Sequence, residues 1–258
     1  QSMKRPSFES DRNRVMIYDR TSGKISDATA GLDQTAHGAK WSPDSKHLYF
    51  TSEHQGTVQV FRVPRAGGRV QQVSEGLFNW NLVDVGPRGS KALVSFMSML
   101  RPSELALLDL VDGTSTTITD VNGKLYKDLE LPEIQQRWVE ATDGKKIHCW
   151  VIYPPNFDRQ KKWPLLTYCQ GGPQGQIGQW FSFRWNFHLM AANGYVIVAP
   201  NRRGLPGFGR RWNDQISGDW GGQAMKDILS ATDAMLAEKF IDRKRAGAIG
   251  ASFGGYTV

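Results

Sequence analysis

Cysteine is scarce in this chain of 258 residues, in which only Cys149 and Cys169 are present. Both fall in apolar, strand-like segments, which favours two buried free thiols, and the sequence leaves a disulfide between them open. Long hydrophobic runs are also missing, since none approaches the ~20 residues that a membrane-spanning helix needs. Residues 1–14 are polar and charged, so we do not expect them to form a signal peptide. The sequence predicts no membrane span.

Metal-ligand and nucleotide motifs are missing as well. No group of Cys, His, Asp and Glu residues has the spacing of a metal site. The glycines at 204, 207 and 209 follow an apolar strand but lack the G-x-G-x-x-G spacing, and the Lys-Ser or Lys-Thr of a phosphate-binding loop is not with them. We therefore expect neither a metal nor another cofactor. Arg203 in this loop is interpreted as a tether that hydrogen-bonds carbonyl or carboxylate groups.

The composition is that of a folded chain with an excess of positive charge. Hydrophobic residues make up 40%, aromatic residues 11% and charged residues 22%, which allows a substantial core in one or two domains. The net charge of +7 is spread along the chain in pairs. These pairs are Lys145-Lys146, Lys161-Lys162, Arg202-Arg203 and Arg210-Arg211. Scattered pairs are typical of a solvated surface, so we expect no nucleic acid partner.

The first half of the chain has the pattern of short strands separated by turns. Strands are expected at residues 15–18, 47–51, 58–63, 92–97 and 105–110. Turn glycines recur at 23, 67 and 113, and the turns at Ser42-Pro43 and Gly86-Pro87 keep the same step of about 44 residues. Such a repeat is typical of four-stranded β-propeller blades, and an antiparallel sandwich is the alternative. Residues 1–130 are therefore interpreted as the C-terminal blades of a propeller whose other blades precede Gln1.

After Pro132 the pattern changes to strands that alternate with helices. Strands are expected at 135–141 and 146–153, joined by an Asp-Gly turn, and at 164–170, 195–199 and 246–250. Helices are expected at 181–192 and 223–240. The first includes an aromatic segment, 180–188, interpreted as packed helix rather than a base-stacking surface. The second repeats Ala224, Ile228, Ala231 and Met235 at helical spacing. This order predicts a doubly wound α/β sheet.

Gly250-Ala251-Ser252-Phe253-Gly254, near the end of the chain, fits the pattern G-x-S-x-G. The pattern alone is a weak signal among 27 glycines, but here it follows an expected strand, as a nucleophile elbow does. The serine of such an elbow has a strained backbone, and the glycines let the strand and the helix pass closely. Ser252 is therefore the candidate nucleophile.

A serine nucleophile needs two backbone N–H groups that bind the developing oxyanion. One belongs to the residue after the serine, Phe253, and the other to the loop after an early strand. The segment Gln170-Gly171-Gly172-Pro173 stands at that place, with a plain glycine turn as the alternative. The five histidines do not stand in the chain order that this fold requires for a general base, so we interpret them as structural or surface residues.

Five motifs follow one another in the second half of the chain. They are Tyr153-Pro154-Pro155-Asn156-Phe157, Gln170-Gly171-Gly172-Pro173, Asn201-Arg202-Arg203-Gly204 with Gly207-Phe208-Gly209, Asp219-Trp220-Gly221, and Gly250-Ala251-Ser252-Phe253-Gly254-Gly255-Tyr256. This series resembles the prolyl oligopeptidase family of serine peptidases, above all its dipeptidyl-peptidase and acylaminoacyl-peptidase branches. The resemblance is strong over residues 132–258 and looser before them. It departs from the family at Gln170, where histidine is common, but a backbone donor does not depend on that side chain.

The resemblance implies a β-propeller at 1–130 and, at 131–258, the N-terminal half of an α/β-hydrolase domain. It implies Ser252 as nucleophile and Gly172 and Phe253 as oxyanion donors. The aspartate and histidine of the triad are then expected within about 100–150 residues after Val258. The implied partner is a peptide substrate, a homodimer is allowed, and a periplasmic or secreted location is favoured.

The implied activity is that of a serine peptidase that cleaves short peptides through an acyl-enzyme and releases N-terminal dipeptides. Two alternatives remain open. One is an acylaminoacyl-peptidase or oligo-endopeptidase of the same family, and the other is a non-catalytic interaction protein built on the propeller and hydrolase scaffold.

Overall fold

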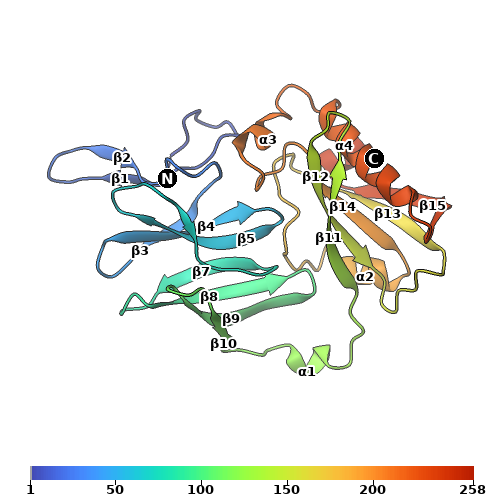
Figure 1. The fold of residues 1–258 in the computed structure, drawn as a ribbon, viewed down its shortest axis with the longest axis horizontal. Coiled ribbons are helices and arrows are strands. Elements are labelled where there is room, and N and C mark those ends of the chain that lie inside the picture. The colour runs from blue at the N-terminus through green and yellow to red at the C-terminus, as the bar shows by residue number, and fades with distance from the viewer. Residues whose placement is uncertain (1) are drawn as a thin grey trace. The chain divides into compact units, whose positions relative to one another are not determined.

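A computed structural model describes residues 2–258, and the chain divides into two compact units (Figure 1). The first unit runs to Gly123 and also includes Gly178–Trp180 and Pro206–Arg210. The second consists of Lys124–Ile177, Phe181–Leu205 and Arg211–Val258. Each unit has its own sheet, and the two are described separately below.

The first unit is built from antiparallel strands, which fall into one hairpin and two four-stranded meanders. The hairpin pairs β1 (Met16–Tyr18) with β2 (Ile25–Asp27). The first meander is β3 (His37–Trp41), β4 (His47–His54), β5 (Thr57–Pro64) and β6 (Gln71–Gln72). The second is β7 (Asn79–Val85), β8 (Lys91–Ser98), β9 (Arg101–Asp109) and β10 (Ser115–Thr117). A single parallel pair between β5 and β7, Val58 with Asn79, joins the meanders. The five strands predicted in this half are confirmed.

The repeated glycines of the sequence occupy equivalent turns. Gly23 lies between β1 and β2, Gly67 between β5 and β6, and Gly113 between β9 and β10, with φ angles of 70°, 80° and 78°. In each turn the glycine N–H donates to a carbonyl three or four residues earlier. A positive φ is accessible to glycine without the steric cost that a Cβ carries. The regular spacing therefore reflects the same turn made three times.

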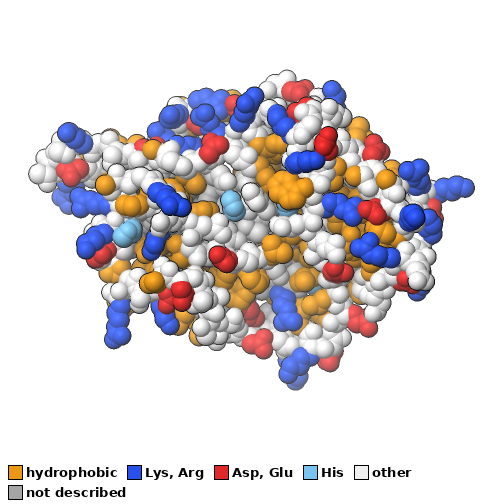
Figure 2. Space-filling view, in the orientation of Figure 1, with side chains coloured by type: hydrophobic (Ala, Val, Ile, Leu, Met, Phe, Trp, Pro, Cys, Tyr) orange, Lys and Arg blue, Asp and Glu red, His pale blue; other side chains and the backbone are white. Residues whose placement is uncertain are grey.

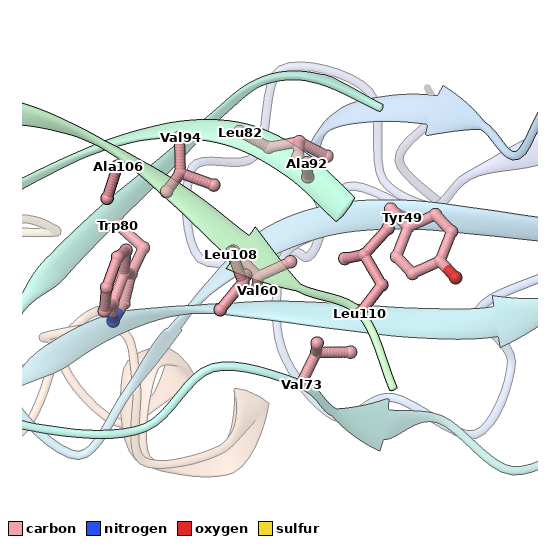
Figure 3. Packing of buried hydrophobic residues seen from close by; sticks show 10 residues of the cluster. All are labelled: Tyr49, Val60, Val73, Trp80, Leu82, Ala92, Val94, Ala106, Leu108 and Leu110. Carbon is pink, nitrogen blue, oxygen red and sulfur yellow. The ribbon is translucent and has the colours of Figure 1, made fainter. Parts of the chain in front are cut away.

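The core of the first unit lies on both faces of its central strands. Because successive side chains of a strand point to opposite faces, Tyr49 enters one cluster whereas Leu48 and Phe50 enter another. The first cluster includes Val60, Trp80 and eight other buried side chains from the two meanders (Figure 3). The second combines residues of β4 and β5 with the segment before β3. Burial on both faces explains why apolar residues stand at adjacent positions in β4, as in Leu48, Tyr49 and Phe50.

The second unit contains a five-stranded mixed sheet in the order β11-β12-β14-β13-β15. The strands are β11 (Glu133–Glu140), β12 (Lys146–Tyr153), β13 (Trp163–Cys169), β14 (Val196–Asn201) and β15 (Ile241–Gly250). The pairs of β13 with β14 and with β15 are parallel, and those of β12 with β11 and with β14 are antiparallel. The helices are α1 (Gly123–Tyr126), α2 (Phe187–Ala192), α3 (Arg210–Asp214), α4 (Gln223–Leu236) and α5 (Phe253–Thr257). The sheet has the α/β organisation predicted for this half.

Sequence periodicity accounts for the two best-packed elements of this sheet. All six residues of β14 are buried, as the continuous apolar run predicted. Helix α4 buries Ala224, Ile228, Ala231 and Met235 on one face, and this face contacts the sheet. The helix ends at Leu236, four residues before the predicted end, because the chain turns there to pair Ile241 with Trp163 at the start of β15.

The predicted helix at 181–192 is wrong over its first half, since α2 begins only at Phe187. Asn186 is extended, with φ −87° and ψ 103°, and its side chain accepts a hydrogen bond from the Leu189 N–H. An N-cap of this kind satisfies a donor at the helix start and so fixes where the helix begins. The preceding aromatic segment is a loop in which Ser182 Oγ accepts from the Trp185 N–H and Phe183 is 86% exposed.

In Figure 2, Lys and Arg side chains lie over the whole visible face, with Asp and Glu side chains among them. Among residues 2–258, no helix combines the length and the apolar character that a membrane crossing requires.

Cys149 and Cys169 are both buried and free, so the expectation of free thiols is confirmed. Burial raises the pKa of Cys149 to about 12.

A buried charge network at the end of β14 ties three elements of the second unit together. The Arg203 guanidinium, 3% exposed, donates to both carboxylate oxygens of Asp143 at 2.6 and 2.7 Å. It also donates to Asp227 Oδ2 at 3.1 Å, and the Arg203 backbone N–H donates to the same oxygen at 2.9 Å. Asp143 belongs to the β11–β12 turn and Asp227 to α4. The interpretation of Arg203 as a tether is confirmed.

We expect Asp143→Asn to lower the thermal stability of the whole protein at pH 7, and the loss to shrink in acid. The Arg203 hydrogen bonds hold the pKa of Asp143 well below its ordinary value of 3.8. A depressed carboxyl pKa stabilises the fold above pH ~4, and this stabilisation is lost as the pH falls toward the folded-state pKa. A hydrogen bond to a charged group contributes about 1.5–3 kcal/mol. Melting curves of both proteins from pH 3 to pH 8 measure the difference.

Glu140→Gln is the matched control for that experiment. Glu140 lies on the same hairpin and pairs with Lys146 at 2.7 Å, but both side chains are more than half exposed. Water and salt screen an exposed pair, so its removal should hardly change the Tm. An Asp143→Asn loss that stayed constant down to pH 3 would contradict the ionic origin of the effect.

Candidate active site

Ser252 lies in a strand-to-helix turn at the carboxyl end of the sheet. Strand β15 ends at Gly250, helix α5 begins at Phe253, and Ser252 between them has φ 57° and ψ −126°. Such a backbone conformation costs a non-glycine residue about 1–3 kcal/mol, and surrounding contacts must enforce it. The Ser252 side chain is exposed and makes no capping hydrogen bond to α5. The strained elbow that the sequence predicted is present.

The two glycines of the elbow are required by a close backbone contact with β13. Cys169, the last residue of β13, is the parallel partner of Gly250. A Cβ on Gly250 would lie 2.8 Å from the Cys169 carbonyl oxygen, and one on Gly254 would overlap that oxygen and lie 3.0 Å from its carbon. Neither position has room for a side chain. The strand and the helix therefore pass within contact distance of β13, which leaves Ser252 at the apex of the turn.

The segment Gln170–Pro173 follows β13 directly and packs against the elbow. A Cβ on Gly171 would lie 2.9 Å from the Ala251 carbonyl oxygen and 3.7 Å from Ser252 Cβ. Gly172 is exposed and has φ 123°, a conformation that L side chains rarely adopt. The Tyr168 hydroxyl donates to Gln170 Oε1 at 2.8 Å. The two segments that the sequence singled out for an oxyanion site thus lie side by side.

Phe253 occupies the first position of α5 and anchors it. Its backbone N–H has no acceptor within the helix, as is general for a first helical residue. Its side chain is 5% exposed and packs with Ile216 and Ala224. The rings of Trp220 and Tyr256 flank it at centroid distances of 5.8 and 5.7 Å. An anchored Phe253 holds its N–H group in place beside Ser252.

Three consecutive residues at the end of β14 each bind a different segment of the second unit, and sequence reasoning assigned a role only to Arg203. Asn201 accepts from the Ile177 N–H at 2.9 Å and donates to the Ile177 carbonyl at 3.1 Å. Arg202 donates to the carbonyls of Gln170 and Pro173. Arg203 holds the carboxylates described above. The signals in the sequence were the run of polar residues directly after a buried strand and the motif Asn201-Arg202-Arg203-Gly204.

The histidines were interpreted as structural or surface residues, and His148 fits that interpretation. It is buried on β12, and its Nδ1 accepts a hydrogen bond from the Asn201 amide at 3.0 Å. Burial lowers its pKa to about 4, so it is neutral at physiological pH. His188 lies on α2, and His37, His47 and His54 lie on strands of the first unit. Among the described residues, no group of His, Cys, Asp and Glu side chains could hold a metal ion.

Comparison with known proteins shows which family this chain resembles. Residues 181–258, which contain α2, β14, α4 and the whole elbow, match the sequence model of the prolyl oligopeptidase family. The resemblance to the prolyl oligopeptidase family is confirmed. The chain is 38% identical over 257 residues to dipeptidyl-peptidase 5 of Porphyromonas gingivalis and 33% identical over 269 residues to that of Trichophyton schoenleinii.

Solved structures of the prolyl oligopeptidase family are similar to the chain along nearly its whole length. The acylaminoacyl peptidase of Pyrococcus horikoshii matches 96% of the chain with a TM-score of 0.81 and 27% identity. An acylaminoacyl peptidase in complex with Z-Gly-Gly-Phe-chloromethyl ketone matches with the same TM-score and 28% identity. The chain spans only part of these proteins, namely 38% of both structures and 37% of the Porphyromonas relative.

We expect Gly250→Ala and Gly254→Ala to destabilise the whole protein and to displace the elbow, because each new Cβ would meet the backbone of Cys169. Overpacking at a rigid site costs about 1–3 kcal/mol or more. Gly247→Ala is the control, since a Cβ at this position of the same strand has nothing within 4 Å. Chemical denaturation and the rate of fluorophosphonate labelling at Ser252 measure the two effects. Equal stability and labelling in all three variants would disprove the contact argument.

Proposed function

We propose that the whole protein is a serine peptidase that releases dipeptides from the N-termini of short peptides. The observation that carries the proposal is the elbow, in which Ser252 has a strained backbone, an exposed side chain and a glycine loop packed beside it. The names of the Porphyromonas and Trichophyton relatives support the dipeptidyl mode. The chain spans about a third of those relatives, so the activity is proposed for the whole protein.

In the proposed reaction, Ser252 Oγ attacks the carbonyl carbon of the second residue of the substrate. The hydroxyl proton passes to the general base, and the carbonyl oxygen becomes an oxyanion that accepts hydrogen bonds from the N–H groups of Gly172 and Phe253. The tetrahedral intermediate then expels the amine, which takes up the proton, and leaves an acyl-enzyme. Water hydrolyses the ester in a second cycle of the same steps. The general base that this reaction needs is a histidine oriented by an aspartate.

The first unit has a proposed role as the C-terminal blades of a β-propeller, with residues 1–130 as that domain and 131–258 as the first half of the hydrolase domain. The two four-stranded meanders and their repeated glycine turns support this assignment. Short peptides are the substrate class that we propose for this protein.

An acylaminoacyl-peptidase activity is the second candidate. The similarity of 96% of the chain to the Pyrococcus acylaminoacyl peptidase favours it. The two activities differ at the substrate N-terminus, because a dipeptidyl-peptidase must bind a free α-ammonium group, whereas an acylaminoacyl-peptidase accepts a blocked one.

Ser252→Ala should reduce kcat of the whole protein by roughly 10⁴–10⁶ and leave KM nearly unchanged, because only the nucleophile is removed. Ser217→Ala, at another exposed serine of the second unit, is the control and should have normal kinetics. Turnover of dipeptidyl-coumarin substrates measures both. Normal turnover by Ser252→Ala would refute the assignment of the nucleophile, whereas a parent protein that shows neither turnover nor fluorophosphonate labelling would favour the non-catalytic interpretation.

The free N-terminus of the substrate provides the second test. Acetylation removes the positive charge of the α-amino group, so an enzyme that anchors this group should lose turnover by ~100-fold or more, the effect of leaving a charged partner unpaired. Matched dipeptidyl-coumarins with free and acetylated N-termini measure the ratio. Faster cleavage of the acetylated substrate would replace the dipeptidyl proposal with the acylaminoacyl one.

A further inference from the structure

The Arg202 side chain is fully buried beside the elbow, and its hydrogen bonds go to backbone carbonyl groups. Its Nη2 donates to the carbonyl oxygens of Gln170 at 3.1 Å and Pro173 at 3.3 Å, and its Nη1 donates to the Arg203 carbonyl at 2.7 Å. The first two acceptors are the residues that flank Gly171-Gly172. One nitrogen atom of Arg202 therefore holds both ends of the glycine loop.

The same guanidinium also contacts the other side of the site. Its Cζ lies 4.4 Å from the centroid of the Phe253 ring, within the distance of a cation–π interaction. Phe253 is the residue whose N–H follows the nucleophile. Arg202 is thus in contact both with the loop that contains Gly172 and with the residue that starts α5.

The chemistry of arginine suits this position. Its guanidinium is planar, so the edge can donate several hydrogen bonds in fixed directions while the face stacks on a ring. Burial lowers the pKa of Arg202 to about 10, which leaves the group charged at neutral pH. The Trp212 indole N–H donates to the Arg202 carbonyl at 3.1 Å and so fixes the backbone from which the side chain extends.

We propose that Arg202 is a positioning residue that sets the distance between the two oxyanion donors, the N–H groups of Gly172 and Phe253. This inference rests on the proposed peptidase function. Gly171 and Gly172 have no side chains that could anchor their loop, and α5 is only five residues long. Oxyanion stabilisation requires donors held about 2.7–3.1 Å from the oxyanion, and small displacements weaken it. A single buried group bonded to both segments meets this requirement.

The test compares Arg202→Lys with Arg203→Lys in the whole protein. The two arginines are adjacent, equally buried and changed in the same way, but Arg203 binds the carboxylates of Asp143 and Asp227 and none of the oxyanion segments. Lysine at 202 keeps the positive charge but lacks the several N–H donors and the planar face of the guanidinium. We expect Arg202→Lys to lower kcat by about 10–10² with KM within threefold, because the donors act mainly in the transition state. Arg203→Lys should lower the Tm with kcat unchanged.

A second readout separates donor geometry from general damage to the fold. A peptide aldehyde adds the Ser252 hydroxyl across its carbonyl, and the resulting hemiacetal oxygen occupies the oxyanion position. A dipeptide analogue that lacks the C-terminal carboxyl group binds the site without any oxygen at that position. Arg202→Lys should therefore weaken aldehyde inhibition by about the same factor as kcat and leave inhibition by this analogue unchanged. Equal losses for both ligands, or an equal fall of kcat in Arg203→Lys, would overturn the inference.

A second variant, Phe253→Leu, and a second probe, fluorophosphonate labelling, complete the test. Phe253→Leu keeps the N–H but removes the ring face, and it should give the same signature if Arg202→Lys does not fold. If neither variant folds while Arg203→Lys does, Arg202 is structural and the inference is wrong. Fluorophosphonate labelling of Ser252 is independent of the peptide chosen. A parent protein that is labelled but cleaves no dipeptidyl substrate would refute the dipeptidyl proposal, and its labelling rate would still test Arg202.

Discussion

The carbonyl group of Cys169 lies against the α-carbons of Gly250 and Gly254, and the position of Ser252 depends on that close backbone contact. Parallel pairing of β13 with β15 brings the ends of the two strands together, and the chain can turn into α5 only if no Cβ intervenes. The strain at Ser252 is the consequence, and it is held by strand pairing on one side and by the buried Phe253 ring on the other. An exposed serine at the apex is the outcome of these packing constraints.

The loops around this apex have little structure of their own and depend on the three polar residues at the end of β14. Asn201, Arg202 and Arg203 lie in sequence, yet each binds a different segment: the Ile177 backbone, the Gln170 and Pro173 carbonyls, and the carboxylates of Asp143 and Asp227. Burying such groups is costly unless they find partners, and here each of the three side chains has hydrogen-bond partners. The end of one central strand thereby organises the neighbourhood of the elbow.

The two units use their strands differently. In the first, meanders of alternating side chains place one cluster on each face of β4 and β5, so the pattern is local and repeats with the chain. In the second, the strands of the parallel part are neighbours only through long crossover connections, and β13 pairs with β15 across a separation that includes α2, β14 and α4. Local repetition is visible in a sequence, whereas such pairing is not.

The sequence by itself determined the five strands of the second sheet and half of the strands described in the first unit, because hydrophobic periodicity and turn glycines act over a few residues. This is why the apolar run at β14, the buried face of α4 and the glycine turns at 23, 67 and 113 could be predicted. The elbow could be predicted too, since the two glycines of G-x-S-x-G are the residues without a Cβ that its close backbone contacts require. The start of α2 was misjudged because the Asn186 cap outweighed the helical length of the aromatic segment. Only the tertiary structure decided that Arg202 joins the Gly172 loop to Phe253. Its acceptors at Gln170 and Pro173 are 32 and 29 residues away, and the direction of a buried guanidinium is set by strand order and burial rather than by its neighbours in the chain.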